Sequence, residues 1–161
     1  MIVRPLPLLR VFFYVSLCTS IGACDGPGEE PDGGASTEQD SGTAVDAFQL
    51  GMEKITDSGH FTVRLKSAQP APPDEGENIW MLEIENQDGD VLTSVTGALT
   101  PWMPEHGHGT NPASYDLVFR EEGSVYEVGP FTLTMPGIWE LKINLATPEQ
   151  DSVVFTFRAE G

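Results

Sequence analysis

The residues best suited to chemistry lie in one short segment, Thr100 to Pro112, which reads TPWMPEHGHGTNP. His106 and His108 stand there with a single glycine between them, and Met103 precedes them. Met135 follows in a second turn-like segment, TMPGIW. Thioether sulfur and imidazole nitrogen together suit Cu(I), and imidazole also suits Cu(II). The set of Met103, His106, His108 and Met135 is therefore a candidate copper site.

The spacing of the two histidines supports a shared ion. Side chains alternate along an extended backbone, so His106 and His108 are expected to project to the same side. Gly107 and Gly109 allow the backbone to bend so that both imidazoles can converge. Glu105 is expected either to orient one imidazole, which is the favoured role, or to add an oxygen ligand.

The same segment also has a purely structural interpretation. Met-Pro, Gly-His-Gly and Asn-Pro are typical of tight turns, which need no metal. In this interpretation the histidines hydrogen-bond neighbouring carbonyl groups, and Met103 and Met135 pack against nearby tryptophans. The third histidine, His60, is expected to be an exposed residue at the start of a strand. The sequence leaves the metal and the structural interpretations open.

Catalytic motifs are missing from the sequence. No serine adjoins the histidines in a way that suggests a triad, and there is no Gly-x-Ser-x-Gly segment. The chain also lacks helical zinc-binding spacing and a phosphate-binding loop followed by a helix. We therefore predict a protein that is not an enzyme, with no small-molecule substrate evident.

The elements that must position these residues are predicted to be strands. Apolar and polar residues alternate in short segments, which is the period of half-buried strands, and turn residues separate the segments. These segments are 60–67, 79–86, 91–100, 114–120, 124–135, 138–145 and 152–158. Residues 45–59 fit no helical period and are expected to form an irregular lead-in or an edge strand. The pattern predicts an all-β, immunoglobulin-like β-sandwich of about seven strands, with Trp80 and Trp139 in its core.

The N-terminal part of the chain does not belong to this fold. Residues 1–23 contain two arginines and then an apolar stretch, VFFYVSLCTSIGA, that is too short to span a bilayer comfortably. The stretch ends in IGAC, which resembles the lipobox of bacterial lipoproteins and makes Cys24 the expected lipidation site. We predict a lipoprotein signal peptide over 1–23, an acidic disordered tether over 24–45 and a folded domain over 46–161.

Charge and cysteine content narrow the partners. The whole chain has 8 basic and 25 acidic residues; without the two arginines of the signal, 6 basic residues remain and the formal charge is −19. Nucleic acid is therefore excluded as a partner, because phosphate binding needs a basic patch. Membrane association is expected to depend on the lipid alone. Both cysteines, Cys18 and Cys24, lie in or at the end of the signal, so the domain has no disulfide.

The order of motifs resembles the YtkA-like or FixH-like domain family of exported bacterial proteins. The segments that carry the resemblance are GHFTVRL, NIWMLEIENQDGDVL, PWMPEHGHGTNP, YEVGPFTLTMPGIWEL and DSVVFTFR, over roughly residues 50–158. The resemblance implies a small immunoglobulin-like sandwich in the cell envelope. Related envelope domains are linked to copper handling and to the assembly of respiratory oxidases.

Together these features predict a non-enzymatic lipoprotein of the bacterial cell envelope. It is expected to be anchored to a membrane through its N-terminal lipid, to face the periplasm or the exterior, and to bind copper through Met103, His106, His108 and Met135. The other hypothesis is an interaction module that docks onto a membrane complex, with the histidine segment purely structural. That hypothesis predicts an exposed apolar or aromatic patch and a protein partner in the envelope.

Overall fold

The structure is a computed structural model that describes residues 44–147 and 149–161. The predicted signal peptide, the lipidation of Cys24 and nearly all of the predicted tether lie outside the described residues. These three predictions stay predictions.

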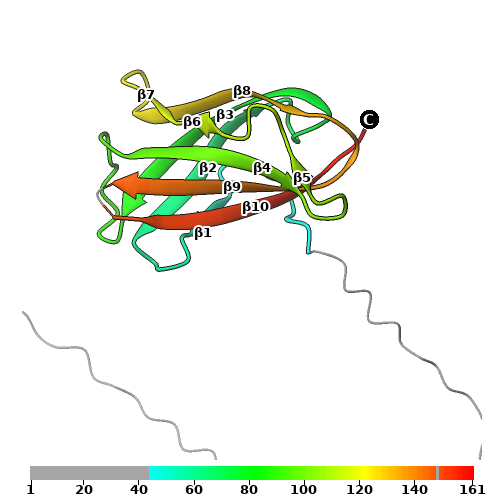
Figure 1. Cartoon of the computed structure of the whole chain (residues 1–161). Coiled ribbons are helices and arrows are strands. Elements are labelled where there is room, and N and C mark those ends of the chain that lie inside the picture. Colours follow the sequence, from blue (N-terminus) through cyan, green and yellow to red (C-terminus); the bar gives the residue numbers. More distant parts are fainter. Residues whose placement is uncertain (1–43, 148) are drawn as a thin grey trace, which may run out of the picture. The chain divides into compact units, whose positions relative to one another are not determined.

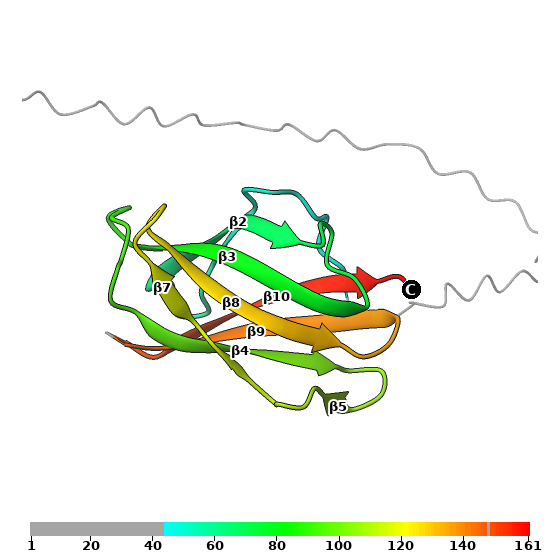
Figure 2. The same ribbon diagram turned by 90° about the horizontal axis from the view of Figure 1, so that it is seen from above.

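The described residues form ten strands and no helix, arranged in two antiparallel five-stranded sheets (Figures 1 and 2). The strands are β1 (Glu53–Ile55), β2 (Phe61–Gln69), β3 (Gly76–Asn86), β4 (Thr96–Met103), β5 (His108–Gly109), β6 (Tyr115–Asp116), β7 (Val118–Arg120), β8 (Val125–Leu133), β9 (Gly137–Thr147) and β10 (Asp151–Ala159). One sheet has the order β1-β2-β3-β8-β7. The other has the order β10-β9-β4-β5, with β6 also paired to β4. The predicted all-β sandwich is confirmed.

The core lies between the two sheets, where the alternating apolar residues of the long strands meet. Trp80 and Trp139 are both fully buried, as predicted from the sequence. The Trp80 ring makes edge-to-face contacts with Phe131, Phe155 and Phe157, each at a centroid distance of 5.8 Å. Such contacts add to the burial of apolar surface, so this cluster is the centre of the packing between the sheets.

Strand β4 differs from its prediction and thereby reaches the candidate site. The sequence suggested a strand over 91–100, but β4 begins at Thr96 and continues through Pro101 to Met103. Proline lacks an N–H and is rare inside sheets. Here β4 pairs with β6 at Ala98 and Leu99 and with β5 only from Trp102 on. Pro101 therefore falls in the gap between these two short strands, where no ladder hydrogen bond is lost on that side.

Residues 114–120 also differ from their prediction as a single strand. They form β6, which pairs with β4, and then β7, which pairs with β8 of the other sheet. Leu117 stands between them, is buried, and donates its backbone N–H to the Gly97 carbonyl at 2.9 Å. The chain thus crosses from one sheet to the other at Leu117, which strand periodicity alone does not reveal.

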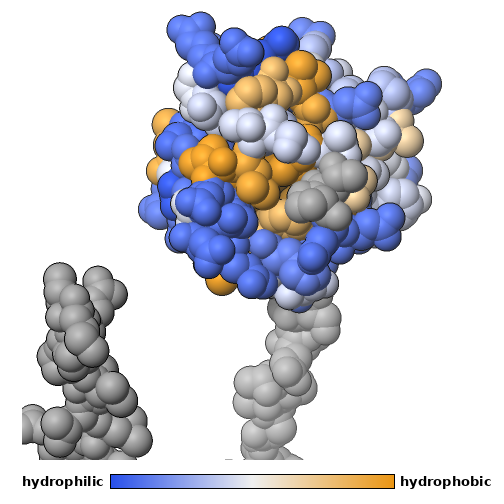
Figure 3. Space-filling model, turned by 90° about the vertical axis from the view of Figure 1, so that its left-hand side faces the viewer, coloured by the Kyte–Doolittle hydropathy of each residue, from blue (hydrophilic) through white to orange (hydrophobic). Residues whose placement is uncertain are grey.

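The two ends of the sandwich differ in surface character. The end that carries the β7–β8 hairpin shows an apolar patch in Figure 3. Val118, the first residue of β7, is exposed. Strand β5 and the loop that precedes it lie at the other end (Figure 1). Within the described part of the chain, no helix is long and apolar enough to cross a membrane.

Candidate metal centre

The histidine segment forms a tight hairpin between β4 and β5. Met103 is the Cα partner of His108, and Trp102 is the partner of Gly109. The Met103 carbonyl accepts the backbone N–H groups of His106 at 3.3 Å and Gly107 at 2.9 Å, which closes the turn. Gly107 has a φ of +66°, which glycine adopts without steric cost. The predicted turn is therefore present, and its register sets which side chains meet.

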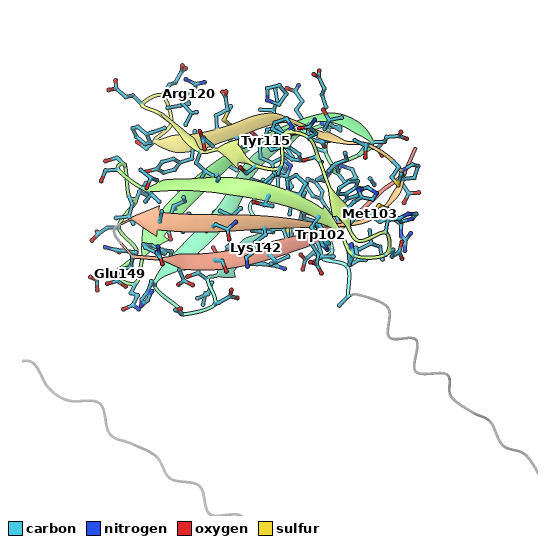
Figure 4. All side chains as sticks on the ribbon, in the orientation of Figure 1. Trp102, Met103, Tyr115, Arg120, Lys142 and Glu149 are labelled. Atoms are coloured by element: carbon cyan, nitrogen blue, oxygen red, sulfur yellow. The ribbon has the colours of Figure 1, made fainter. Side chains whose placement is uncertain are left out.

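The register places Met103 and His108 on the inner face of the sheet. Directly opposite residues of an antiparallel pair point to the same side, with Cβ atoms about 4.5–5.5 Å apart. Met103 is fully buried in the core, and His108 is half-buried at its edge. Trp102 points the other way and is 42% exposed on the outer face. Figure 4 shows Trp102 and Met103 together at the end of β4.

The two imidazoles lie next to each other, although not through strand alternation as the sequence suggested. His106 is an exposed residue of the turn, and only His108 belongs to a strand. Their ring centroids are 5.9 Å apart, with an angle of 65° between the planes. Metal–nitrogen bonds of about 2.0–2.1 Å place the centroids of two imidazoles on one ion within roughly 6.5 Å of each other. The observed separation fits a shared ion.

His108 has one ring nitrogen engaged and one available. Its Nδ1 lies 3.1 Å from the Gly109 carbonyl oxygen. A carbonyl oxygen can only accept a hydrogen bond, so this contact requires the proton to be on Nδ1. Nε2 of the neutral ring then carries a free lone pair, as a metal ligand must. The ring also contacts Trp139 edge-to-face, at a centroid distance of 6.0 Å.

The Met103 thioether lies against the start of β9. A Cβ atom placed on Gly137 would overlap the Met103 Cε methyl and would lie 4.0 Å from the Met103 sulfur. The same position is 3.7 Å from the Glu105 carboxylate oxygen Oε2. Gly137 is therefore the point at which the β8–β9 connection meets the histidine hairpin.

Met135 has a less direct link to the histidine hairpin than Met103 has. It is half-buried in the β8–β9 connection and packs against the hydrophobic core. Its backbone carbonyl accepts the Trp139 indole N–H at 3.0 Å. The connection from Met135 to the hairpin runs through Trp139, which contacts the His108 ring. The structure therefore pairs Met103 with His108 and sets the His106 ring beside the His108 ring, whereas Met135 is linked to them only by the hydrogen bond from Trp139 to its backbone carbonyl.

The candidate ligands at this hairpin include a thioether sulfur. Across residues 44–147 and 149–161, no group of three or more histidine, cysteine, aspartate or glutamate side chains is arranged to hold a metal ion. The donors at the hairpin are two imidazoles and a thioether, which is a set suited to copper rather than to calcium or magnesium. The chemistry of the side chains fits copper.

A second polar cluster, around Asp151, was missed at the level of sequence. The buried Asp151 carboxylate accepts the Thr56 hydroxyl at 2.6 Å and the backbone N–H groups of Ser58 at 3.0 Å and Ser152 at 2.8 Å. Burial alone would raise the pKa of Asp151, but these hydrogen bonds, together with one from the His60 backbone, outweigh it and hold the pKa well below its usual range. An Asp at the start of a strand with no neighbouring cation gives no sequence signal of this role.

His60 belongs to this cluster and is half-buried, whereas the sequence predicted an exposed residue. Its side chain is 37% exposed, with Nε2 3.0 Å from the Glu149 carboxylate and Nδ1 3.4 Å from the Asp151 carboxylate. It therefore joins the turn before β2 to the start of β10, where the two sheets come together. This contact is a structural one, away from the histidine hairpin.

Comparison with known proteins gives one match. A family model described as YtkA-like matches residues 56–144, which is more than half of the chain and includes the hairpin and the β8–β9 connection. No curated protein and no solved structure matches the sequence.

Proposed function

The chain belongs to the YtkA-like family, and from this premise we propose that it is a copper-binding module of the bacterial cell envelope. The copper ligands in this proposal are His106, His108 and Met103, and Met135 is the fourth candidate. The protein holds copper or passes it on, in copper handling or in the assembly of a respiratory oxidase, and it performs no catalysis.

The observation that carries the proposal is the hydrogen bonding of the two ring nitrogens of His108. Its Nδ1–H is fixed by the Gly109 carbonyl, which leaves Nε2 free. Outer hydrogen bonds of this kind are typical of metal-binding histidines, because they set the tautomer and the orientation of the ring. The free nitrogen belongs to a residue that pairs directly with Met103 and whose ring neighbours that of His106. A purely structural turn requires the hydrogen bond, and core packing accounts for the buried Met103, but neither gives a reason for a second imidazole beside the free nitrogen.

The envelope location is the second part of the proposal and rests on the N-terminal sequence. A lipid on Cys24 would hold the domain at the membrane, facing the periplasm or the exterior, and residues 24–45 would act as the tether. Residues 25–161 contain no cysteine, so a copper site in this domain has imidazole and thioether as its soft donors.

Metal analysis of the chain from Ala44 onward, which contains both sheets and the whole described core, tests the proposal. Loaded anaerobically with Cu(I) and then freed of unbound metal, it is expected to retain about one copper ion per chain. The double substitution His106→Ala with His108→Ala should reduce the retained copper to background. His60→Ala is the matched control, since it removes the third histidine outside the hairpin and should leave copper retention unchanged. Retention that is absent in the unsubstituted protein, or equal in all three proteins, contradicts the proposal.

A second candidate function is docking onto an envelope protein through the outer face of the β10-β9-β4 sheet. Trp102 is exposed on this face, and tryptophan is enriched at protein interfaces. Lys142 (Figure 4) and Arg158 are exposed on the neighbouring strands. The part of the chain that the structure describes holds no ion-pair partner for either. A face with two unpaired cations on a strongly acidic protein would suit a partner with a carboxylate-rich surface.

Co-purification from membranes separates the two candidates. Docking predicts a partner that is lost on Trp102→Ala and kept in the His106→Ala, His108→Ala protein. Val118→Ala is the control, because Val118 has an exposure of 44%, close to the 42% of Trp102, and lies at the opposite end of the sandwich. A partner whose binding is insensitive to Trp102→Ala would refute docking through this face.

A further inference from the structure

Gly137 lies directly against the end of the Met103 side chain. The Met103 side chain is fully buried, and its Cε methyl fills the space in which a Cβ of residue 137 would stand. Gly137 has a φ of +136°, a conformation that residues with a side chain rarely adopt. Both its backbone conformation and its lack of a side chain are therefore adapted to this contact.

The order of the strands shows on which side of Met103 its methyl group and His108 lie. β4 lies between β9 and β5, so Gly137 at the start of β9 and His108 in β5 flank Met103 on opposite sides. The thioether methyl is held on the β9 side, against Gly137. The lone pairs of a thioether sulfur point away from its two carbon substituents. With the methyl on the β9 side, the sulfur can present its lone pairs toward the side on which His108 lies.

We infer that Gly137 determines the preference of the site for Cu(I) over Cu(II), because its lack of a side chain leaves the Met103 thioether in a position from which the sulfur can reach an ion held by His106 and His108. This inference rests on the proposed copper-binding function. Cu(I) favours thioether ligands, whereas Cu(II) is well served by imidazole nitrogen and oxygen. A side chain at residue 137 moves the Met103 thioether, which is the flexible end of its side chain, and leaves the backbone of the His106–His108 hairpin in place. Affinity for Cu(I) then falls, while affinity for Cu(II) is retained.

The experiment compares Cu(I) and Cu(II) affinities of the chain by competition with chelators of known affinity. Gly137→Ala is expected to weaken Cu(I) binding about ten-fold or more, in the range found when groups around metal ligands are changed, and to change Cu(II) affinity less than about two-fold. Gly76→Ala is the matched control. Gly76 is also the first residue of a strand and has a φ of +97°, but no heavy atom lies within 4 Å of its Cβ position. Its substitution also strains the backbone at a positive φ, but it touches no methionine and should leave both affinities unchanged.

A second background separates the effect of the contact with Met103 from that of the backbone strain at residue 137. Met103→Ala removes the methyl that a Cβ at 137 would overlap. In that background Gly137→Ala should cause no further loss of Cu(I) affinity, because the sulfur on which it acts is already gone. A further loss of Cu(I) affinity there, or an equal effect of Gly137→Ala on Cu(I) and Cu(II) in the unsubstituted chain, overturns the inference but leaves the copper function standing. Absence of copper binding by the unsubstituted chain overturns both.

Discussion

Asp151→Asn is expected to destabilise the fold strongly, although the two residues have the same shape. One carboxylate oxygen, Oδ2, accepts the Thr56 hydroxyl at 2.6 Å and the His60 N–H at 3.3 Å. The other, Oδ1, accepts the N–H groups of Ser58 and Ser152. The amide of asparagine retains one oxygen but places an N–H₂ group opposite the His60 N–H, which is also a donor. Two of the four hydrogen bonds are therefore lost or weakened.

The size of the effect follows from the charge on the acceptor. Hydrogen bonds to charged groups contribute about 1.5–3 kcal/mol each, so losing two predicts a decrease of about 3 kcal/mol or more in the free energy of unfolding. Urea unfolding at pH 7 measures it. Asp88→Asn is the control, since Asp88 lies exposed in the β3–β4 connection and should change stability by less than about 0.5 kcal/mol.

The pH dependence provides an independent check. The pKa of Asp151 is lower in the folded protein than in the unfolded chain. The stabilisation that the ionised Asp151 adds to the free energy of unfolding is therefore complete above its pKa in the unfolded chain, about 3.9. This stabilisation is lost as the pH falls below that pKa. The difference between the unsubstituted protein and Asp151→Asn should be constant from pH 8 to about pH 5 and should narrow below about pH 4. A difference under about 1 kcal/mol at pH 7, or one that does not narrow in acid, would refute this account of the cluster.

Three further predictions concern the core and the hairpin. Met103→Ala should lower the free energy of unfolding by about 2–5 kcal/mol. Met103→Leu should lower it by less than about 1.5 kcal/mol, because leucine preserves the side-chain volume. Equal losses of the two variants in urea unfolding would show that Met103 is not a packed core residue. Trp80→Ala should cost about 3–5 kcal/mol and Trp102→Ala less than about 1 kcal/mol, and the reverse order would contradict the assignment of inner and outer faces. Cu(II) should quench tryptophan fluorescence, because Trp139 contacts the His108 ring and Trp102 lies in the same hairpin. This quenching should decrease in Trp139→Phe and disappear in His108→Ala; quenching that persists in His108→Ala places the metal elsewhere.

The sequence predicted those parts of the fold whose signal is local. The alternation of Phe61, Val63 and Leu65 against polar neighbours marked β2, and the same period marked β9 and β10, because one face of each strand packs against the other sheet. The crossing at Leu117 was not predictable, since residues 114–120 alternate in the same way whether they pair with one sheet or with two.

The candidate site was predictable in composition but not in geometry. The sequence identified Met103, His106 and His108, yet it treated the segment as a loop. The structure makes Met103 the buried last residue of a strand and leaves His106 exposed in the turn. That difference depends on the pairing of Met103 with His108, a contact that hydrophobic periodicity does not encode. The role of Gly137 likewise depends on a contact between two segments distant in sequence.

The most direct test of the copper site is X-ray absorption spectroscopy of the Cu(I)-loaded protein. The proposed ligands predict that the extended fine structure at the copper edge shows nitrogen neighbours at about 2.0–2.1 Å and at least one sulfur neighbour at about 2.3 Å. The sulfur contribution should diminish in Met103→Leu, which keeps the core filled. A spectrum with nitrogen and oxygen neighbours alone, or a sulfur contribution that Met103→Leu leaves unchanged, would contradict the assignment of Met103, His106 and His108 as a single copper site.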